Sequence, residues 1–155
     1  MYNNSMRLVV QRVEKAKVLR QAQDKSWETV GEISKGLFVL VGVKKGDTEK
    51  DVEALAAKLS KLRVMSDEND KMNLSITNAG GSMLVVSQFT LHADTSGGNR
   101  PSFINAEEPK QAKELYEFFV KKLRDGGIKV ETGSFGDYMK IETVLDGPVT
   151  ILYSD

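Results

Sequence analysis

The sequence predicts a single domain of the α+β class, in which a mostly antiparallel or mixed β-sheet carries two helices on one face. Three observations lead to this expectation. The chain has 155 residues, the usual size of one domain, and contains no linker, repeat or low-complexity segment. Apolar runs of strand length recur along it, and two longer segments space their apolar residues as an amphipathic helix does.

Four strands are predicted in the first third of the chain, over residues 7–13, about 15–20, 27–33 and 37–43. The last of these is a nearly continuous apolar run, so we expect it to be buried on both faces. A turn at residues 34–36 joins it to the strand before it.

Two helices are predicted from their caps and apolar faces. The first opens at Asp47 or Thr48, either of which can cap a helix. The second starts near Pro109, because proline is favoured in a first helical turn, and ends at the glycine pair 126–127. The apolar faces comprise Val52, Leu55, Leu59 and Leu62 in the first helix and Ala112, Leu115, Phe119 and Leu123 in the second.

The strongest strand signal in the sequence runs from Met83 to Leu91. A weaker candidate covers residues 72–76, and three more strands are expected at about 128–132, 138–145 and 149–153. Residues 92–108 form a long polar loop. Loops of this length in a compact domain are often functional.

The composition excludes several kinds of site. There is no cysteine, which rules out thiol catalysis, disulfides and zinc–thiolate sites, and the single histidine, His92, rules out a His-rich metal site. We therefore expect neither a metal nor a cofactor. The charges balance, at 22 basic and 22 acidic residues, whereas proteins that coat nucleic acid are usually strongly basic. Any contact with nucleic acid should therefore be small and local.

The chain carries no signal for a membrane. No apolar run approaches the roughly 18 residues of a transmembrane helix. Residues 1–5 contain no apolar stretch like that of a signal peptide. We therefore expect a cytoplasmic protein without a membrane partner.

The first candidate site lies where the strand from Met83 changes from apolar to polar. Ser87, Gln88 and Thr90 stand at its end beside the long loop, a common place for chemistry, although polar groups there also serve to hydrogen-bond a sheet edge. A Ser87–His92 catalytic pair is not favoured, because five extended residues span about 17 Å and a nucleophile needs its base within about 3 Å. We expect His92 on the surface or in the loop.

Two further segments are candidates. Residues 146–150 separate two predicted strands, and their Gly147-Pro148 pair permits backbone shapes that other residues avoid, although a plain hairpin turn is the simpler interpretation. The loop segment 97–103 includes Arg100, which could contact the phosphate of a polynucleotide end. A solvated loop would have the same composition.

Seven motifs follow one another along the chain in a distinctive order and spacing. They are Met6–Val13, Gly42–Thr48, Met72–Ser75, Val85–Leu91, Gly98–Phe103, Gly133–Met139 and Asp146–Thr150. Each alone is weak, but together they resemble the D-aminoacyl-tRNA deacylase family over nearly the whole chain. The resemblance implies the fold of that family, with residues 6–155 as the domain and residues 1–5 as an N-terminal extension.

The resemblance implies an enzyme of chiral proofreading in translation, which hydrolyses the ester of D-aminoacyl-tRNA, and of mischarged glycyl-tRNA, at the 3′ CCA end. It also implies a homodimer with a β-barrel-like interface and each active site at the subunit boundary. The catalytic segment of one subunit would comprise Ser87, Gln88, Phe89 and Thr90. The other subunit would contribute a chiral gate, a cis Gly147-Pro148 pair whose carbonyls exclude an L-side chain.

Three more residues match supporting positions of the family. Arg12 would steady the Gly-Pro pair, and Phe135 and Met139 would line the pocket. One position departs from the family pattern, since Leu145 stands where asparagine is common. Leucine cannot hydrogen-bond, so the gate would need its local support from elsewhere.

The catalytic segment supplies backbone N–H groups around Phe89 and Thr90 for an oxyanion, but no side-chain base. We therefore favour attack by a positioned water, assisted by the 2′-hydroxyl of the terminal adenosine, which is the mechanism that the resemblance implies. Thr90 as a covalent nucleophile is the alternative. Two rival classes stay open at this point: a module that binds an RNA end without hydrolysis, and a hydrolase of another ester.

Overall fold

The computed structural model describes residues 6–154; the predicted N-terminal extension, residues 1–5, lies outside the described residues, as does Asp155. The strands are Arg7–Gln21 (β1), Trp27–Ile33 (β2), Gly36–Gly42 (β3), Met65–Ser66 (β4), Met72–Leu74 (β5), Ser82–Ser87 (β6), Lys129–Thr132 (β7) and Met139–Tyr153 (β8). The helices are Glu49–Ser60 (α1), Ile76–Ala79 (α2) and Pro109–Asp125 (α3), and Phe89–His92 form a 3₁₀ helix (η1).

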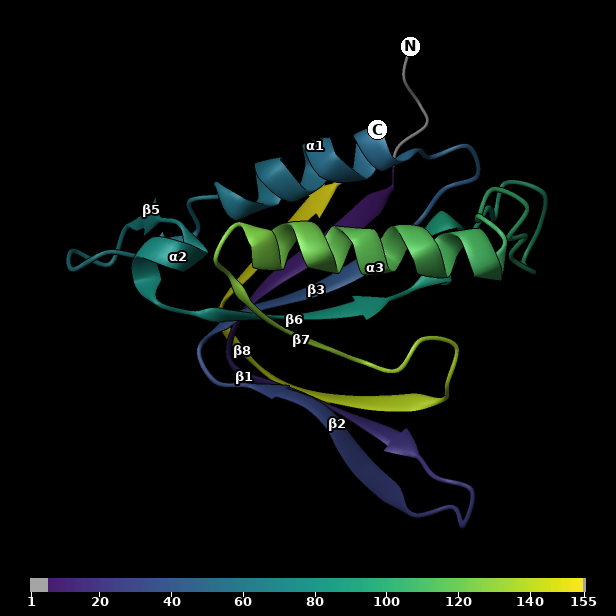
Figure 1. Cartoon of the computed structure of the whole chain (residues 1–155), viewed down its shortest axis with the longest axis horizontal. Coiled ribbons are helices and arrows are strands. Elements are labelled where there is room, and N and C mark those ends of the chain that lie inside the picture. Colours follow the sequence, from purple (N-terminus) through teal and green to yellow (C-terminus); the bar gives the residue numbers. More distant parts are fainter. Residues whose placement is uncertain (1–5, 155) are drawn as a thin grey trace.

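One mixed sheet of six strands is organised around the long strand β1 (Figure 1). Its order is β2-β1-β3-β6-β7, and β8 also pairs with β1. The pairs of β1 with β2, β3 and β8 are antiparallel, whereas β3–β6 and β6–β7 are parallel. The sheet twists and curls until β2 contacts β7 at the other end of the order, so it is nearly closed into a barrel. The predicted fold class is confirmed.

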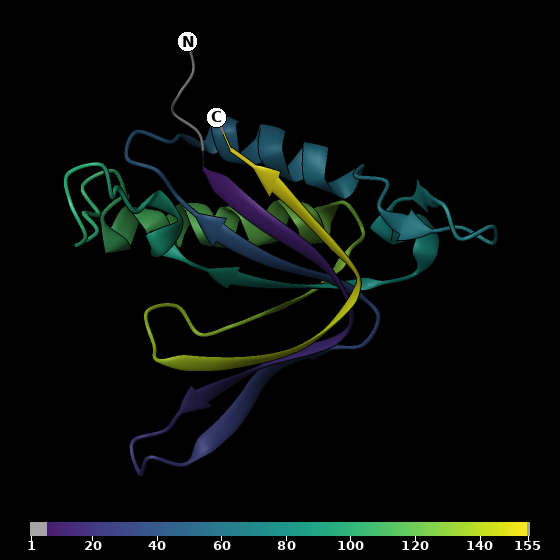
Figure 2. The same ribbon diagram turned by 180° about the vertical axis from the view of Figure 1, so that it is seen from behind.

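The helices α1 and α3 lie side by side on one face of the sheet, as predicted (Figures 1 and 2). Thr48 caps α1: its hydroxyl accepts from the N–H of Asp51 at 3.4 Å, while the Asp51 carboxylate accepts from the N–H of Thr48 at 2.8 Å. Glu108 caps α3 by accepting from the N–H of Gln111 at 3.0 Å, and Pro109 occupies the first turn. Within residues 6–154, no helix is long and apolar enough to cross a membrane.

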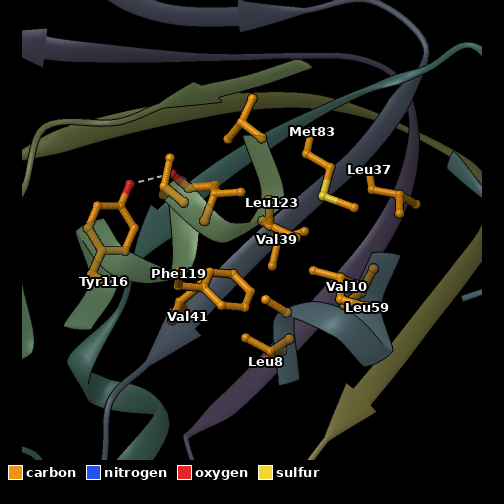
Figure 3. Close-up of a cluster of buried hydrophobic side chains, with 14 of the residues drawn as sticks. Leu8, Val10, Leu37, Val39, Val41, Leu59, Met83, Tyr116, Phe119 and Leu123 are labelled. Carbon is orange, nitrogen blue, oxygen red and sulfur yellow. Dashed lines mark hydrogen bonds between the residues drawn. The ribbon is translucent and has the colours of Figure 1, made fainter. Parts of the chain in front are cut away.

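The main core fills the space between these helices and the sheet (Figure 3). The buried side chains that meet there include Leu8, Val10, Val39, Leu59, Phe119 and Leu123. Tyr116 of α3 joins them, and its hydroxyl donates a hydrogen bond of 2.6 Å to the carbonyl of Val85 on β6. Burial raises the pKa of Tyr116, so the hydroxyl stays protonated and remains a donor. A second apolar cluster, which includes Val13, Phe38 and Leu84, covers the opposite face of the sheet.

Two pairs of predicted strands are in fact single long strands. The first two predicted strands are the halves of β1, because exposed Glu14 and Lys15 interrupt the apolar pattern while pairing with β8 shifts register at Glu14 and resumes at Lys15. The last two are the halves of β8, which resumes its pairing at Thr150 after the Gly147-Pro148 interruption. The spacing of apolar residues reports side-chain burial, so it does not show that backbone pairing continues past exposed residues.

The strand predicted from Met83 to Leu91 is wrong in its second half. β6 ends at Ser87, and the chain turns into η1. Gly42, at the end of β3, makes the turn possible, because a Cβ there would lie 2.9 Å from the Cβ of Leu91 and 3.0 Å from the carbonyl oxygen of Gln88. A side chain at position 42 would therefore push η1 away from β3.

The middle of the chain holds a short helix that periodicity does not predict. The weak strand expected at residues 72–76 is present only as β5, and α2 follows it directly. Ser75 caps α2 by accepting a hydrogen bond of 3.2 Å from the N–H of Asn78, which turns the backbone at Ile76 into a helix.

Candidate active site

A pocket of about 680 Å³ opens where β6 meets η1. Three segments that are far apart in the sequence line it, with Ser87, Gln88 and Phe89 from β6 and η1, Phe103 from the long loop, Phe135 from the connection between β7 and β8, and Met139 from the start of β8. Its volume falls in the range of small-molecule sites, roughly 300–1,000 Å³. The fold thus brings together most of the catalytic and pocket residues that the sequence suggested, and their roles stay predictions.

Two backbone N–H groups stand at the start of η1, whose first residue, Phe89, lines this pocket. The first hydrogen bond within η1 runs from the N–H of Leu91 to the carbonyl of Gln88, at 3.3 Å. The N–H groups of Phe89 and Thr90 precede this donor, so the helix itself offers them no acceptor. Adjacent N–H groups at a helix start form an electropositive point that can stabilise a developing oxyanion.

The side chains of the same segment contact one another and the long loop. The Gln88 side-chain amide donates a hydrogen bond to the hydroxyl of Thr90. The backbone N–H of Gln88 donates to the carbonyl of Val41 on β3 at 2.7 Å, which fixes the segment to the sheet. Exposed Phe89 packs edge to face with Phe103, their ring centroids 5.0 Å apart. Thr90 does not line the pocket.

Phe135 and Met139 form another part of the pocket wall and are connected to the core. The sulfur of Met139 lies 3.3 Å from the backbone nitrogen of Ser134, which donates to it. The ring of Phe135 lies 5.9 Å, centroid to centroid, from the ring of Tyr116, whose hydroxyl is bonded to β6. This wall is therefore held in position by the packing of α3 on the sheet.

The sequence places Phe103 in the candidate segment 97–103 but does not predict that it lines a pocket, and it does not single out Glu107, Glu108 or Asp137; all four line the pocket. Phe103 is the one aromatic residue of the loop 92–108, a signal that could have singled it out. Each carboxylate accepts a hydrogen bond from a group within three residues of it. That of Glu108 caps α3, and that of Glu107 also accepts from the N–H of Gly46 at 3.4 Å, so all three have structural partners. Among residues 6–154, no cluster of three or more His, Asp or Glu is placed to hold a metal ion.

His92 is buried, which corrects the expected position on the surface or in the loop. Its side chain is 2% exposed, and its Nε2 lies 2.8 Å from the carbonyl oxygen of Gly42. The cause is η1, which folds back over β3 and carries the ring against the strand's end. The extended spacing that argued against a Ser87–His92 pair does not apply here, but His92 lies outside the pocket lining and contacts the backbone of β3 instead.

The Gly147-Pro148 pair lies in a bulge of β8. Pairing with β1 stops at Leu145 and resumes at Thr150, so the residues between them stand opposite the single residue Arg12. The Gly147–Pro148 peptide bond is cis, and both residues are exposed. The segment is therefore neither the plain hairpin turn nor the strand break that its sequence suggested.

Arg12 holds this bulge from the β1 side. Its side chain is only 11% exposed. Its Nη1 donates to the carbonyl of Val64 at 2.9 Å and to the hydroxyl of Ser66 at 3.2 Å. Its Nε donates to the backbone carbonyl of Asp146 at 3.2 Å and lies 3.2 Å from the Asp146 carboxylate. The guanidinium thus supplies the polar support that Leu145 cannot give.

We expect Arg12→Met to lower the free energy of unfolding by about 2 kcal/mol, because it removes several charge-assisted hydrogen bonds from a nearly buried position. Urea unfolding followed by circular dichroism measures the loss. Arg12→Lys is the control: it keeps the charge but not the planar fork, so it should recover only part of the stability. An unchanged unfolding midpoint for Arg12→Met would show that these bonds do not stabilise the bulge.

The gate pair and the pocket lie apart within one chain. The pocket lining includes neither Gly147 nor Pro148 nor Arg12. Met139, on the pocket wall, precedes Gly147 by eight positions on β8, or roughly 25 Å of extended strand. The fold brings the predicted catalytic segment and the pocket wall together, and it leaves Gly147 and Pro148, the predicted gate, outside the pocket lining.

Comparison with known proteins agrees over nearly the full length of the chain. The model of the D-Tyr-tRNA(Tyr) deacylase family matches residues 9–154. A protein of Thermotoga petrophila named D-aminoacyl-tRNA deacylase is 54% identical over 147 residues, 95% of each chain. A protein of the same name from Clostridioides difficile is 52% identical over 147 residues, again 95% of each chain.

Two solved structures share the fold. The c-Myc DNA Unwinding Element Binding Protein superposes with a TM-score of 0.87 at 35% identity, over 96% of this chain and 98% of its own. A probable eukaryotic D-amino acid tRNA deacylase superposes with a TM-score of 0.81 at 15% identity, over 97% and 99%. Together with the motifs, the family match and the identities above one half show that this chain belongs to the D-Tyr-tRNA(Tyr) deacylase family.

Proposed function

We propose that this protein is a D-aminoacyl-tRNA deacylase, which hydrolyses the ester between a D-amino acid and the 3′ CCA end of tRNA. The observation that carries the proposal is the pocket that brings Ser87, Gln88 and Phe89, where β6 meets η1, together with Phe135 and Met139. The names of the curated relatives support the substrate class.

In this pocket the ester carbonyl lies against the N–H groups of Phe89 and Thr90. Water attacks the carbonyl carbon, and the two donors stabilise the negative charge that develops on the carbonyl oxygen. The bond between the carbonyl carbon and the ribose oxygen then breaks. The ribose oxygen takes up a proton that the attacking water has released, and the products are free tRNA and the free amino acid. The 2′-hydroxyl of the terminal adenosine assists the proton transfer, because no side chain of the segment Ser87–Thr90 is a base at neutral pH.

The chiral gate comes from a second copy of the chain in a homodimer. Gly147 and Pro148 are exposed and are held from behind by Arg12, so they can enter a partner's pocket, although they lie outside their own. β8 also exposes apolar side chains that an interface would cover, namely Val144, Leu145 and Leu152. Two-fold symmetry lets each subunit give and receive one gate.

A gate built from backbone carbonyls distinguishes the configuration of the α-carbon and not the identity of the side chain. D and L amino acids differ by the exchange of hydrogen and side chain at one carbon, and a fixed wall of carbonyls clashes with only one arrangement. Discrimination among different D-side chains should therefore be weak. Glycine has no side chain to reject, so glycyl-tRNA is a substrate as well.

Thr90→Ala should keep kcat within about tenfold of the wild-type value, because the hydroxyl that it removes makes one hydrogen bond, to Gln88, and lies outside the pocket lining. Single-turnover hydrolysis of D-Tyr-tRNA measures this. If Thr90 were the covalent nucleophile, the variant would be inactive, and mass spectrometry of the wild-type enzyme would trap a tyrosyl group on Thr90.

A binding module without hydrolysis is the second candidate, and the name of the structural neighbour at 35% identity favours it. The balanced charge of the chain argues against an extended nucleic-acid surface. The two functions separate in one experiment, in which the protein is mixed with D-Tyr-tRNA. Release of free D-tyrosine in proportion to enzyme concentration supports the deacylase, whereas a stable complex without release would support the binding module.

A further inference from the structure

An aromatic pair stands at the rim of the pocket. Tyr138 lines the pocket, yet 73% of it is exposed. Its ring lies 6.0 Å, centroid to centroid, from the ring of Trp27 at an interplanar angle of 53°. The ammonium of Lys140 lies 4.4 Å from the centroid of the Trp27 ring. We call Trp27, Tyr138 and Lys140 the rim cluster.

Backbone pairing holds the rim cluster in place. Trp27 begins β2 and pairs with Gln21 at the end of β1, and Lys140 of β8 pairs with Leu19 of the same strand. The N–H of Gln21 also donates to the carbonyl of Tyr138 at 3.3 Å. The end of β1 therefore carries Trp27 on one side and Tyr138 with Lys140 on the other, so the rings are preorganised by the sheet.

Lys140 places a positive charge beside the rings of the rim cluster. The carboxylates of Glu28 and Asp137, which neighbour Trp27 and Tyr138 in the chain, both lie near Arg20, which contacts Glu28 directly and lies 3.9 Å from Asp137. Lys140 lies over a ring and not against a carboxylate. A positive charge beside an exposed aromatic ring is the combination by which proteins hold single-stranded nucleic acid, with bases stacked on rings and phosphates near cations.

We propose that the rim cluster binds the nucleotide that precedes the terminal adenosine of the substrate, with its base stacked on Tyr138 and its phosphate near Lys140. This inference rests on the proposed function. The pocket takes the terminal nucleoside and its ester, and most of Tyr138 faces outward from that pocket. A base on its free face therefore belongs to the next nucleotide along the single strand. Trp27 supports Tyr138 from behind and positions Lys140.

The kinetic test compares two substrates, D-Tyr-tRNA and the minimal ester D-tyrosyl-adenosine, which lacks the preceding nucleotide. For Tyr138→Ala, the ratio of kcat/KM on the tRNA to kcat/KM on the minimal ester should fall about tenfold, the size of one lost base–aromatic stack. Tyr138→Phe keeps the ring and should restore the ratio. Equal losses on both substrates, or an unchanged ratio, would overturn the proposal.

Lys140 has a matched control in Lys129, an exposed lysine on β7. Lys140→Ala should weaken the dependence of KM for the tRNA on salt concentration, because one phosphate contact is lost. Lys129→Ala makes the same change in net charge and should leave that dependence as it is. The same salt dependence in both variants would show that Lys140 acts only through overall charge, which contradicts the proposal.

Binding can be measured without hydrolysis, since Trp27 is the only tryptophan of the chain. Titration with the trinucleotide CCA should change the fluorescence of Trp27, with about tenfold weaker affinity in Tyr138→Ala. Equal affinity in the two proteins would overturn the rim cluster while the deacylase activity stands. A wild-type enzyme that binds CCA but does not hydrolyse D-Tyr-tRNA would instead overturn the proposed function.

Discussion

Phe89→Pro is expected to lower kcat on D-Tyr-tRNA about 100- to 1,000-fold, the usual cost of removing one oxyanion donor. Proline deletes the N–H of residue 89, one of the two donors at the start of η1. The backbone should accommodate the change, because residue 89 is the first of a 3₁₀ helix and Gln88 before it is extended, at φ −145° and ψ 90°.

Phe89→Ala is the matched control, because it removes the same aromatic ring and keeps the N–H. It should lose the contact with Phe103 and bind substrate more weakly, with a much smaller change in kcat. Circular dichroism of both variants verifies the fold, and single-turnover kinetics separates the chemical step from binding. Equal losses of kcat in the two variants would show that the ring and not the N–H group serves catalysis.

Gly147→Ala is expected to lower the ratio of the rates on D-Tyr-tRNA and L-Tyr-tRNA at least tenfold. Gly147 has a φ of 121°, which L-residues rarely adopt, and a Cβ there would lie 3.0 Å from Cγ2 of Val149 and 3.2 Å from Nη2 of Arg12. The bulge must therefore shift against the group that holds it. A loss of about 1.4 kcal/mol in discrimination corresponds to the tenfold change.

Gly127→Ala is the control for backbone strain. Gly127 also has a positive φ, at 88°, but a Cβ there meets nothing within 4 Å. This variant should lose stability by about 1 kcal/mol and keep the selectivity between D and L substrates. If both glycine variants kept the wild-type selectivity, Gly147 would not belong to a chiral gate.

Mixing the two active-site variants tests whether the gate is shared between subunits. In a mixed dimer, the intact pocket of the Gly147→Ala subunit receives the intact gate of the Phe89→Pro subunit. Excess Phe89→Pro protein should therefore restore the selectivity of Gly147→Ala toward the wild-type value, after unfolding and refolding of the mixture. A gate that acted on its own subunit's pocket would leave the selectivity of the mixture as low as before.

The elements that the sequence predicts correctly are those whose signals are local. Thr48, one of the two predicted caps, does cap α1, and Pro109 stands in the first turn of α3 as predicted. The 3₁₀ helix η1 could not be predicted in this way. It depends on the absence of a side chain at Gly42, nearly fifty positions earlier in the chain, and the burial of His92 follows from the same contact.

The same distinction between local signals and tertiary contacts applies to the residues of the candidate site. Family motifs identify Ser87 to Thr90 and the Gly147-Pro148 pair, because these residues lie within short segments of distinctive sequence. Phe103 and Tyr138 were not singled out as pocket residues, since they reach the pocket only through the packing of the long loop and the start of β8. That Gly147 and Pro148, the predicted gate, lie outside the pocket of their own chain likewise follows from the folded sheet.

Parallel hydrolysis of D-Tyr-tRNA and L-Tyr-tRNA by the wild-type enzyme tests the central claim most directly. Both substrates share the tRNA, the ester and the side chain, so a difference in rate reports only the configuration of the α-carbon. The predicted result is rapid release of D-tyrosine, while L-Tyr-tRNA decays no faster than it does without enzyme. Equal rates on the two substrates would contradict the chiral gate, and release of neither amino acid would contradict the deacylase itself.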